Sequence, residues 1–161
     1  MWIRVAQSGV KLGLRGSHQA KIDDKGRLKL PTSYRAYIDT TWKTAAVYLT
    51  CDDAAGAYVR VYPLPVWESI EQKLLTMPSS DLARRRFHRW TAMYGQECEI
   101  DAQGRVLIPP QLRDTALMQG DVVVLGSGDF LEVWNRERFI SQADAEKLTA
   151  SDHDRLSEFG I

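Results

Sequence analysis

One short sequence occurs twice in this chain. Residues 20–35 read AKIDDKGRLKLPTSYR and residues 98–113 read CEIDAQGRVLIPPQLR, so the two segments align at a constant offset. A repeated segment of this kind indicates that one supersecondary unit has been built twice. The chain is therefore expected to consist of two halves with the same order of strands and helices. The identical positions are Ile22 and Ile100, Asp23 and Asp101, Gly26 and Gly104, Arg27 and Arg105, Pro31 and Pro109, and Arg35 and Arg113.

Each copy carries the signals of a β-hairpin followed by a helix. An Asp-x-x-Gly segment between alternating apolar residues is typical of a tight turn, and Gly26 and Gly104 can adopt the positive φ that closes it. A proline then suits the start of a short helix, expected over residues 31–38 and 110–117. Further downstream, apolar runs around turn residues predict a second hairpin in each copy. Its strands are expected at residues 45–50 and 58–62 in the first copy and at residues 121–125 and 130–134 in the second.

Four short strands cannot bury both faces of a sheet by themselves. Two copies that close on each other as a barrel would remove the exposed edges, so a barrel is the expected architecture. Apolar residues at helical spacing predict two helices between the copies, the second capped by Asp81, which link the copies and cover the barrel. Residues 139–161 are compatible with a helix. Residues 1–14 show no pattern and are expected to form an extension that can be disordered.

The composition bears on the class of function. The 161 residues include 21 Lys and Arg and 21 Asp and Glu, so only a local basic surface could attract nucleic acid. The three histidines and two cysteines lack metal-ligand spacing, so we expect no metal, no cofactor, no small-molecule substrate and no enzyme activity. Cys51 and Cys98 fit a reducing cytoplasm best, although a single bridge between them stays open. Neither a signal peptide nor a membrane-spanning run is evident, which predicts a soluble, cytoplasmic protein.

The repeat, together with Tyr62-Pro-Leu-Pro-Val-Trp67-Glu and Ala83-Arg-Arg-Arg-Phe87-His-Arg, resembles the MraZ family of bacterial transcriptional regulators. Each copy also resembles the AbrB-like (SpoVT-AbrB) swapped-hairpin DNA-binding domain. This resemblance implies an α+β, β-rich fold in which two AbrB-like halves form a double-split β-barrel with linking and C-terminal helices. The implied boundaries are residues 17–66 for the first half, 67–94 for the linking helices, 95–138 for the second half and 139–161 for the C-terminal helix and tail.

The same resemblance implies a biological role. It predicts a ring-shaped homo-oligomer of eight subunits that binds double-stranded DNA at short tandem repeats. These repeats would lie upstream of its own operon, a cell-division and cell-wall gene cluster, so that the protein would regulate transcription at the nucleoid. The family uses the arginine of this motif to meet DNA, which singles out Arg27. The family usually begins near the equivalent of Gly16, so the segment up to Leu14 departs from its pattern.

Charge distinguishes the two copies. The first hairpin is basic, and the residues expected to contact DNA are Arg15, Lys21, Lys25, Arg27 and Lys29. The second hairpin is acidic around its arginine, so it is expected to act as a scaffold, with Arg105 as a structural partner of Asp101. Asp23 can accept hydrogen bonds from the guanidinium of the same motif, but it is expected mainly to cap its own turn, as is Asp101. Gly26 and Gly104 allow these turns to form.

Other functions and contacts stay open beside DNA binding. A protein–protein module, such as an antitoxin-like ring, could grip partner chains through aromatic anchors. The candidate anchors are Trp42, Trp67 and Trp90. The basic residues 84–86 and Arg89 are expected to form a solvated face or a subunit contact rather than a DNA contact.

Overall fold

The structure is a computed structural model that describes residues 13–51 and 57–161. Within these residues, each copy of the repeat forms four strands and one helix in the predicted order. The first copy comprises β1 (Ser17–Ile22), β2 (Arg27–Lys29), α1 (Thr32–Trp42), β3 (Ala46–Thr50) and β4 (Tyr58–Pro63). The second comprises β5 (Gly95–Glu99), β6 (Arg105–Leu107), α4 (Pro110–Thr115), β7 (Gly120–Gly126) and β8 (Leu131–Asn135). Between them lie α2 (Leu64–Leu75) and α3 (Leu82–Met93), and after them α5 (Arg136–Ala145) and α6 (Ala150–Ser157).

Each copy begins with the predicted tight turn. The glycines of the two turns have φ of 80° and 79°, in the left-handed region that glycine enters without strain. The helices that follow end where the backbone turns left-handed. Helix α1 continues past its predicted end to Trp42, ahead of Lys43 at φ 53°, whereas α4 stops early at Thr115, ahead of Leu117 at φ 52°.

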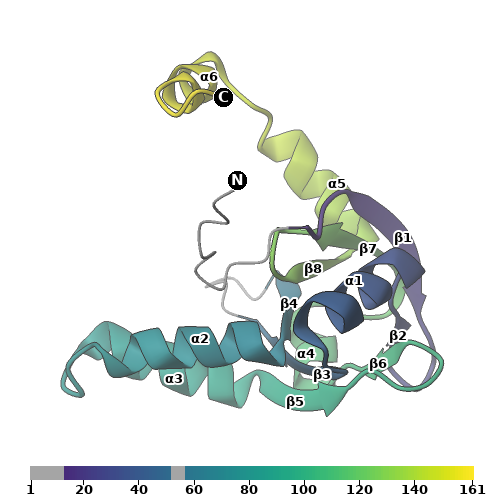
Figure 1. The fold of residues 1–161 in the computed structure, drawn as a ribbon. Coiled ribbons are helices and arrows are strands. Elements are labelled where there is room, and N and C mark those ends of the chain that lie inside the picture. Colours follow the sequence, from purple (N-terminus) through teal and green to yellow (C-terminus); the bar gives the residue numbers. More distant parts are fainter. Residues whose placement is uncertain (1–12, 52–56) are drawn as a thin grey trace, which may run out of the picture.

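The strands of the described residues form one antiparallel sheet, in the order β5-β3-β4-β8-β7-β1-β2-β6. The copies exchange strands, since β1 pairs with β7, β5 with β3, β2 with β6 and β4 with β8. This set of pairings is unchanged when the two copies are interchanged. The sheet curls until its end strands, β5 and β6, come into contact, which makes it a nearly closed barrel (Figure 1). The predicted α+β fold of two interlocked halves with additional helices is thereby confirmed.

The core fills the inside of the barrel and draws on both copies. In the middle of β2 and β6, Leu28 and Val106 lie opposite each other and are buried, with 0% and 1% of their surface exposed. Because side chains alternate along a strand, their neighbours on both strands face outward. Ile38 of α1 and Leu112 of α4, both buried, belong to the same core cluster. The burial of Leu28 and Val106 therefore fixes the register of the β2–β6 ribbon.

Helices α2 and α3 form a hairpin that projects away from the barrel (Figure 1), which corrects the expectation that they cover it. Only their barrel ends are buried, through Trp67 in α2 and Thr91 in α3. The apolar side chains face each other across the hairpin, as in the stacking of Trp67 on Phe87 with ring centroids 6.2 Å apart. The predicted cap of α3 is confirmed, because the Asp81 carboxylate accepts hydrogen bonds from two amides of the first turn.

The start of the described chain is part of the barrel. Leu14 forms an isolated β-bridge with Gly128 and is 2% exposed. Gly126 allows this close approach, since a Cβ at that position would lie 2.2 Å from the backbone nitrogen of Arg15. The last two residues of the expected N-terminal extension are thus held by the β7–β8 hairpin. The rest of the extension, residues 1–12, lies outside the described residues.

Each hairpin turn is held by the other copy. The amide of Leu30 donates to the carbonyl of Gly104, and the amide of Ile108 donates to the carbonyl of Gly26, both at 2.9 Å. These two hydrogen bonds join equivalent positions of the repeat in opposite directions. The two turns therefore stabilise each other.

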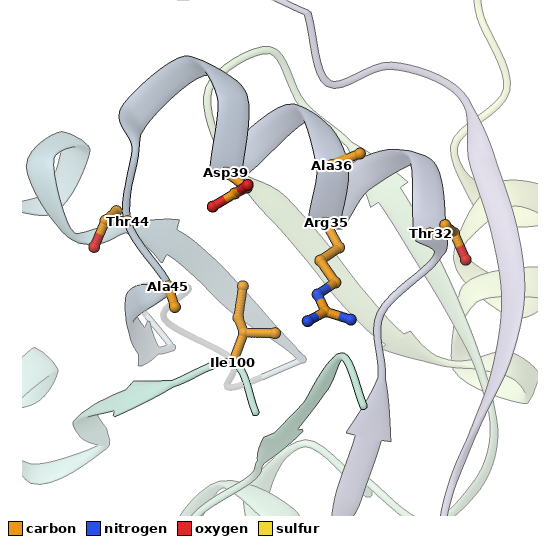
Figure 2. Close-up of a pocket in the computed structure, with 7 residues that line it drawn as sticks. All are labelled: Thr32, Arg35, Ala36, Asp39, Thr44, Ala45 and Ile100. Atoms are coloured by element: carbon orange, nitrogen blue, oxygen red, sulfur yellow. The ribbon is translucent and has the colours of Figure 1, made fainter. Parts of the chain in front are cut away.

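The repeated arginines, Arg35 and Arg113, complete this arrangement. Figure 2 shows Arg35 pointing from α1 toward the hairpin of the second copy, where its Nη2 donates to the carbonyl of Ala102 at 3.2 Å. Arg113 lies in a similar way over Gly26, and its Nε donates to the carbonyl of Ile108 at 2.7 Å. The identity of these arginines in the two copies thus has a structural reason.

We expect Gly26→Ala to lower the free energy of unfolding more than Gly120→Ala. Both positions have positive φ, 80° and 65°, so both substitutions carry a backbone strain of about 1–2 kcal/mol. A Cβ at Gly26 would also lie 2.0 Å from Cζ of Arg113, which would have to give up its bond to Ile108, whereas nothing lies within 4 Å of Gly120. Urea unfolding should show an additional loss of about 1 kcal/mol at Gly26. Equal losses at the two positions would show that Arg113 does not support the turn.

Candidate nucleic-acid interface

The β2–β6 ribbon has one side in the core and one side outside. The register pairs Arg27 with Leu107, Leu28 with Val106, and Lys29 with Arg105. Since Leu28 and Val106 are buried, the side chains on either side of them project outward. We call this surface the outer ribbon face, and it consists of Arg27, Lys29, Arg105 and Leu107.

Two cations lie directly opposite each other on the outer ribbon face. Lys29 of the first copy and Arg105 of the second are cross-strand partners, an arrangement that lowers stability because like charges repel. Arg27 lies on the same face two residues away along β2, so three cations from both copies share it. Leu107, opposite Arg27, is 51% exposed. This combination of basic and apolar side chains is suited to a polyanion.

Arg27 is oriented by Asp23, as the motif predicts. Its Nε donates to Oδ2 of Asp23 at 2.8 Å, between side chains that are 37% and 34% exposed. The other carboxylate oxygen accepts from the amides of Lys25 and Arg27 at 3.0 and 2.9 Å. Asp23 therefore caps the turn, as expected, and also fixes the direction of the guanidinium. The Nη groups of Arg27 have no partner among the described residues, so they are available to an anion.

The second copy repeats the turn cap but not the ion pair. Oδ1 of Asp101 accepts from two amides of its own turn, including that of Arg105, at 2.9 Å each. Among the described residues, no ion pair joins the Arg105 side chain to Asp101, Glu97 or Glu99. Among the described residues, Arg105 is thus bonded to Asp101 through its backbone amide and not through its side chain. The pairing of β6 with β2 places Arg105 beside Lys29.

The other basic residues predicted to contact DNA do not all join this face. Lys25 lies in the exposed turn that precedes Arg27. Lys21 of β1 lies 3.8 Å from a carboxylate oxygen of Asp121. Arg15 precedes β1 at the end remote from the turn, roughly 20 Å away at about 3.3 Å per residue. Only part of the predicted basic set therefore gathers at the outer ribbon face.

The place of Arg105 was not predicted from the sequence, although the repeat contained a signal for it. Leu28 and Val106 are equivalent positions of the two copies, so the pseudo-two-fold axis passes between them. Strands that cross such an axis bring Arg105 opposite Lys29 and Arg27 opposite Leu107. The residues that precede Arg105 in the sequence are acidic, but its cross-strand neighbour, Lys29, is basic.

The tryptophans considered as anchors for a partner protein belong mainly to the fold. Trp67 is 5% exposed and stacks on Tyr48, with ring centroids 4.5 Å apart. Trp42 packs against the core cluster, and Trp90 contacts Tyr94 with centroids 4.6 Å apart. The three residues therefore do not form a common exposed aromatic surface.

The remaining described residues offer little reactive chemistry. No group of three or more His, Cys, Asp or Glu side chains among them is placed to hold a metal ion. None of the described helices has both the length and the apolar character needed to cross a membrane. Cys98 is not in a disulfide, which excludes the bridge to Cys51. Burial, and after it the charge of Glu97, raises the pKa of the Cys98 thiol to about 11, so the thiol stays protonated at neutral pH.

We expect the pKa of Asp23 to lie below the ordinary value of an aspartate. The amide of Arg27 lowers this pKa most; desolvation opposes it, and the guanidinium of Arg27 and the amide of Lys25 lower it further. These bonds stabilise the fold above the ordinary pKa, and the stabilisation is lost as the pH falls through the lowered folded pKa. In an NMR titration, Arg27→Ala should move the pKa part of the way back, whereas the control Lys29→Ala should have little effect. A wild-type Asp23 with an ordinary pKa would contradict this role of the carboxylate.

Comparison with known proteins identifies the family. The family model described as "MraZ protein, putative antitoxin-like" matches the chain in two segments, residues 14–90 and 92–158. A protein named transcriptional regulator MraZ from Acidobacterium capsulatum is 42% identical over 147 residues, which are 91% of this chain and 99% of the relative. The relative of the same name from Koribacter versatilis is 38% identical over 147 residues, 91% and 99% of the two chains. That from Thioalkalivibrio sulfidiphilus is 37% identical over 130 residues, 81% and 85%.

The matched segments include both copies of the repeat, the α2–α3 hairpin except for one residue, and both C-terminal helices. The resemblance to the MraZ family is thus confirmed, and the match reaches residue 158. Membership in a family of transcriptional regulators, not enzymes, is consistent with the basic outer ribbon face of the barrel. The chain belongs to the MraZ family of transcriptional regulators.

Proposed function

We propose that this regulator binds double-stranded DNA through the outer ribbon face. The observation that carries the proposal is the cross-strand pair of Lys29 and Arg105, which keeps two cations side by side at the expense of stability. Phosphate groups or base acceptors placed between them would relieve the repulsion. The relatives are named as transcriptional regulators, which supports DNA as the polyanion.

A two-stranded antiparallel ribbon fits the major groove of B-DNA. Since its other side is packed in the barrel, the β2–β6 ribbon would enter the groove with its outer face. Arg27, oriented by Asp23, and Arg105 can then donate paired hydrogen bonds to guanine. Lys29 and the turn residue Lys25 are suited to phosphates, which set the register of the protein on the duplex without reading its sequence.

A single subunit is expected to bind weakly at cellular salt. Lys29 and Lys25 would neutralise about two phosphates, which corresponds to a salt slope of about −1.8. Lys21 and Arg15 lie farther away and would add phosphate contacts only where the duplex passes them. A few salt-sensitive contacts of this kind do not make a tight complex on their own.

Repetition of the subunit and of the DNA site would overcome this weakness. We propose that the protein assembles as a ring homo-oligomer of eight subunits whose neighbours engage successive short tandem repeats. Each bound repeat then raises the effective concentration at the next one. The proposed target lies upstream of its own operon, a cell-division and cell-wall gene cluster, so the protein would act at the nucleoid.

Arg105→Gln is expected to weaken DNA binding about tenfold or more, since the loss of one good base contact costs about 1–3 kcal/mol. Lys29→Gln should weaken binding to all sequences alike and reduce the salt slope by about 1. Lys147→Gln, which removes an exposed cation between α5 and α6, is the matched control. Fluorescence anisotropy with a duplex that carries the upstream repeat, across a salt series, measures all three variants. Wild-type affinity and salt dependence in Arg105→Gln would refute the outer ribbon face as the contact surface.

Affinity is expected to rise steeply with the number of DNA repeats. Two intact repeats should bind about 10²–10⁴ times more tightly than one, because the second contact forms at a high effective concentration. A duplex of the same length with its second repeat scrambled is the control. Equal affinity for the two duplexes would argue against avidity while leaving the contact surface itself untouched.

A further inference from the structure

Helix α6 is held at both ends by its own residues. At its start, the amide of Asp152 donates to Oγ1 of Thr149 at 3.1 Å and the amide of Thr149 donates to Oδ2 of Asp152 at 2.8 Å, which forms a capping box. At its end, Gly160 has a φ of 77°. The amide of Ile161 donates to the carbonyl of Leu156 at 3.2 Å, as in a Schellman motif. These local bonds give α6 a defined shape.

The apolar side of α6 has nothing to cover it among the described residues. No residue of α6 is buried, and Phe159 and Ile161 just beyond it are 67% and 80% exposed. Leu156 completes this side and is only half-buried. Figure 1 shows α6 standing apart from the barrel. A helix as short as α6 depends on packing for most of its stability, so α6 lacks the partner that its apolar side requires.

A groove of about 350 Å³ on the α2–α3 hairpin has a matching character. Leu74 and Leu75 supply its apolar lining, and Leu75 is 64% exposed. Arg84, Arg85 and His88 supply most of its polar lining. Glu71 of α2 also lines the groove, but α3 contains four arginines and no acidic residue, so positive charge outweighs negative charge around the groove.

The surroundings of α6 carry the opposite charge. Acidic residues outnumber basic ones over residues 144–158. The acids there are Asp144, Glu146, Asp152, Asp154 and Glu158, against Lys147 and Arg155. Complementary charge around two apolar surfaces steers their encounter and fixes their relative orientation. The α2–α3 groove is therefore a fitting site for α6.

The two surfaces lie far apart, with α6 beyond α5 at the top of the view and the α2–α3 hairpin extending from the lower part of the barrel (Figure 1). We propose that α6 of one subunit docks into the α2–α3 groove of a second copy of this chain. Each subunit then offers one surface of each kind, so the contact is head-to-tail and can close into a ring. This interface would hold together the ring of the proposed function. The proposed contact depends on the proposed function only in that the function requires a ring.

Two variants remove one side of the contact each. Phe159→Asp places a charge on the apolar side of α6, and Leu75→Asp places one in the groove. Both positions are exposed in the single subunit, so both variants are expected to fold. Ile140→Asp, at an exposed apolar position of α5 (49%), is the matched control. By light scattering, the wild type and Ile140→Asp should form the same oligomer, whereas each of the other two variants should be monomeric.

Mixing the two monomeric variants tests whether α6 and the groove bind each other directly. The Leu75→Asp subunit keeps an intact α6 and the Phe159→Asp subunit keeps an intact groove, so together they should form a heterodimer and nothing larger. Wild-type oligomers in either variant alone, or no association in the mixture, would overturn the proposal. A monomeric wild type would overturn it as well, and would point to docking of α6 on its own chain or on another protein. Binding of both variants to a single DNA repeat distinguishes loss of this contact from failure of the outer ribbon face.

Discussion

The burial of Leu28 against Val106 fixes the register on which the barrel and its basic surface both depend. A shift of the β2–β6 pairing by one residue would turn the apolar pair outward and bring the cations of the outer ribbon face into the core. The same register allows each hairpin turn to bond to the other copy through Gly26 and Gly104. The pairing of β2 with β6 that buries this apolar pair is thus also the pairing that displays Lys29 beside Arg105.

The stability of the fold and the proposed binding of DNA oppose each other at this ribbon. Asp23 balances the charge of Arg27, but no carboxylate of the described residues pairs with Arg105. The two copies carry different side chains at one equivalent position of the ribbon. Lys29 of the first copy corresponds to Leu107 of the second. As a result, one cross-strand pair of the pseudo-symmetric ribbon joins two cations, Lys29 and Arg105, and the other joins Arg27 to Leu107. In the proposed complex, this asymmetry would give the ribbon a direction with which to read a DNA sequence that is not itself symmetric.

Local signals in the sequence predicted the turns, the strands, the cap at Asp81 and the barrel, because turn glycines and alternating apolar residues act over a few neighbours. The features that were not predicted depend on contacts between distant residues. Charge near Asp101 predicted a scaffold role for Arg105, but it could not predict that strand exchange places Lys29 opposite Arg105. Trp67 packs against Phe87 across the α2–α3 hairpin and stacks on Tyr48 of β3, contacts that helical periodicity alone does not reveal.

The most direct measurement is the effect of Arg105→Glu on folding stability and DNA affinity in the same protein. A carboxylate opposite Lys29 turns a repulsive cross-strand pair into an attractive one, so the free energy of unfolding should rise by about 0.2–1 kcal/mol. DNA affinity should fall by about 100-fold or more, because an anion would then face the phosphates and base acceptors. A gain in stability together with a loss of DNA binding is the predicted result. A loss of stability, or DNA binding at wild-type strength, would contradict a basic ribbon kept for DNA at the expense of the fold.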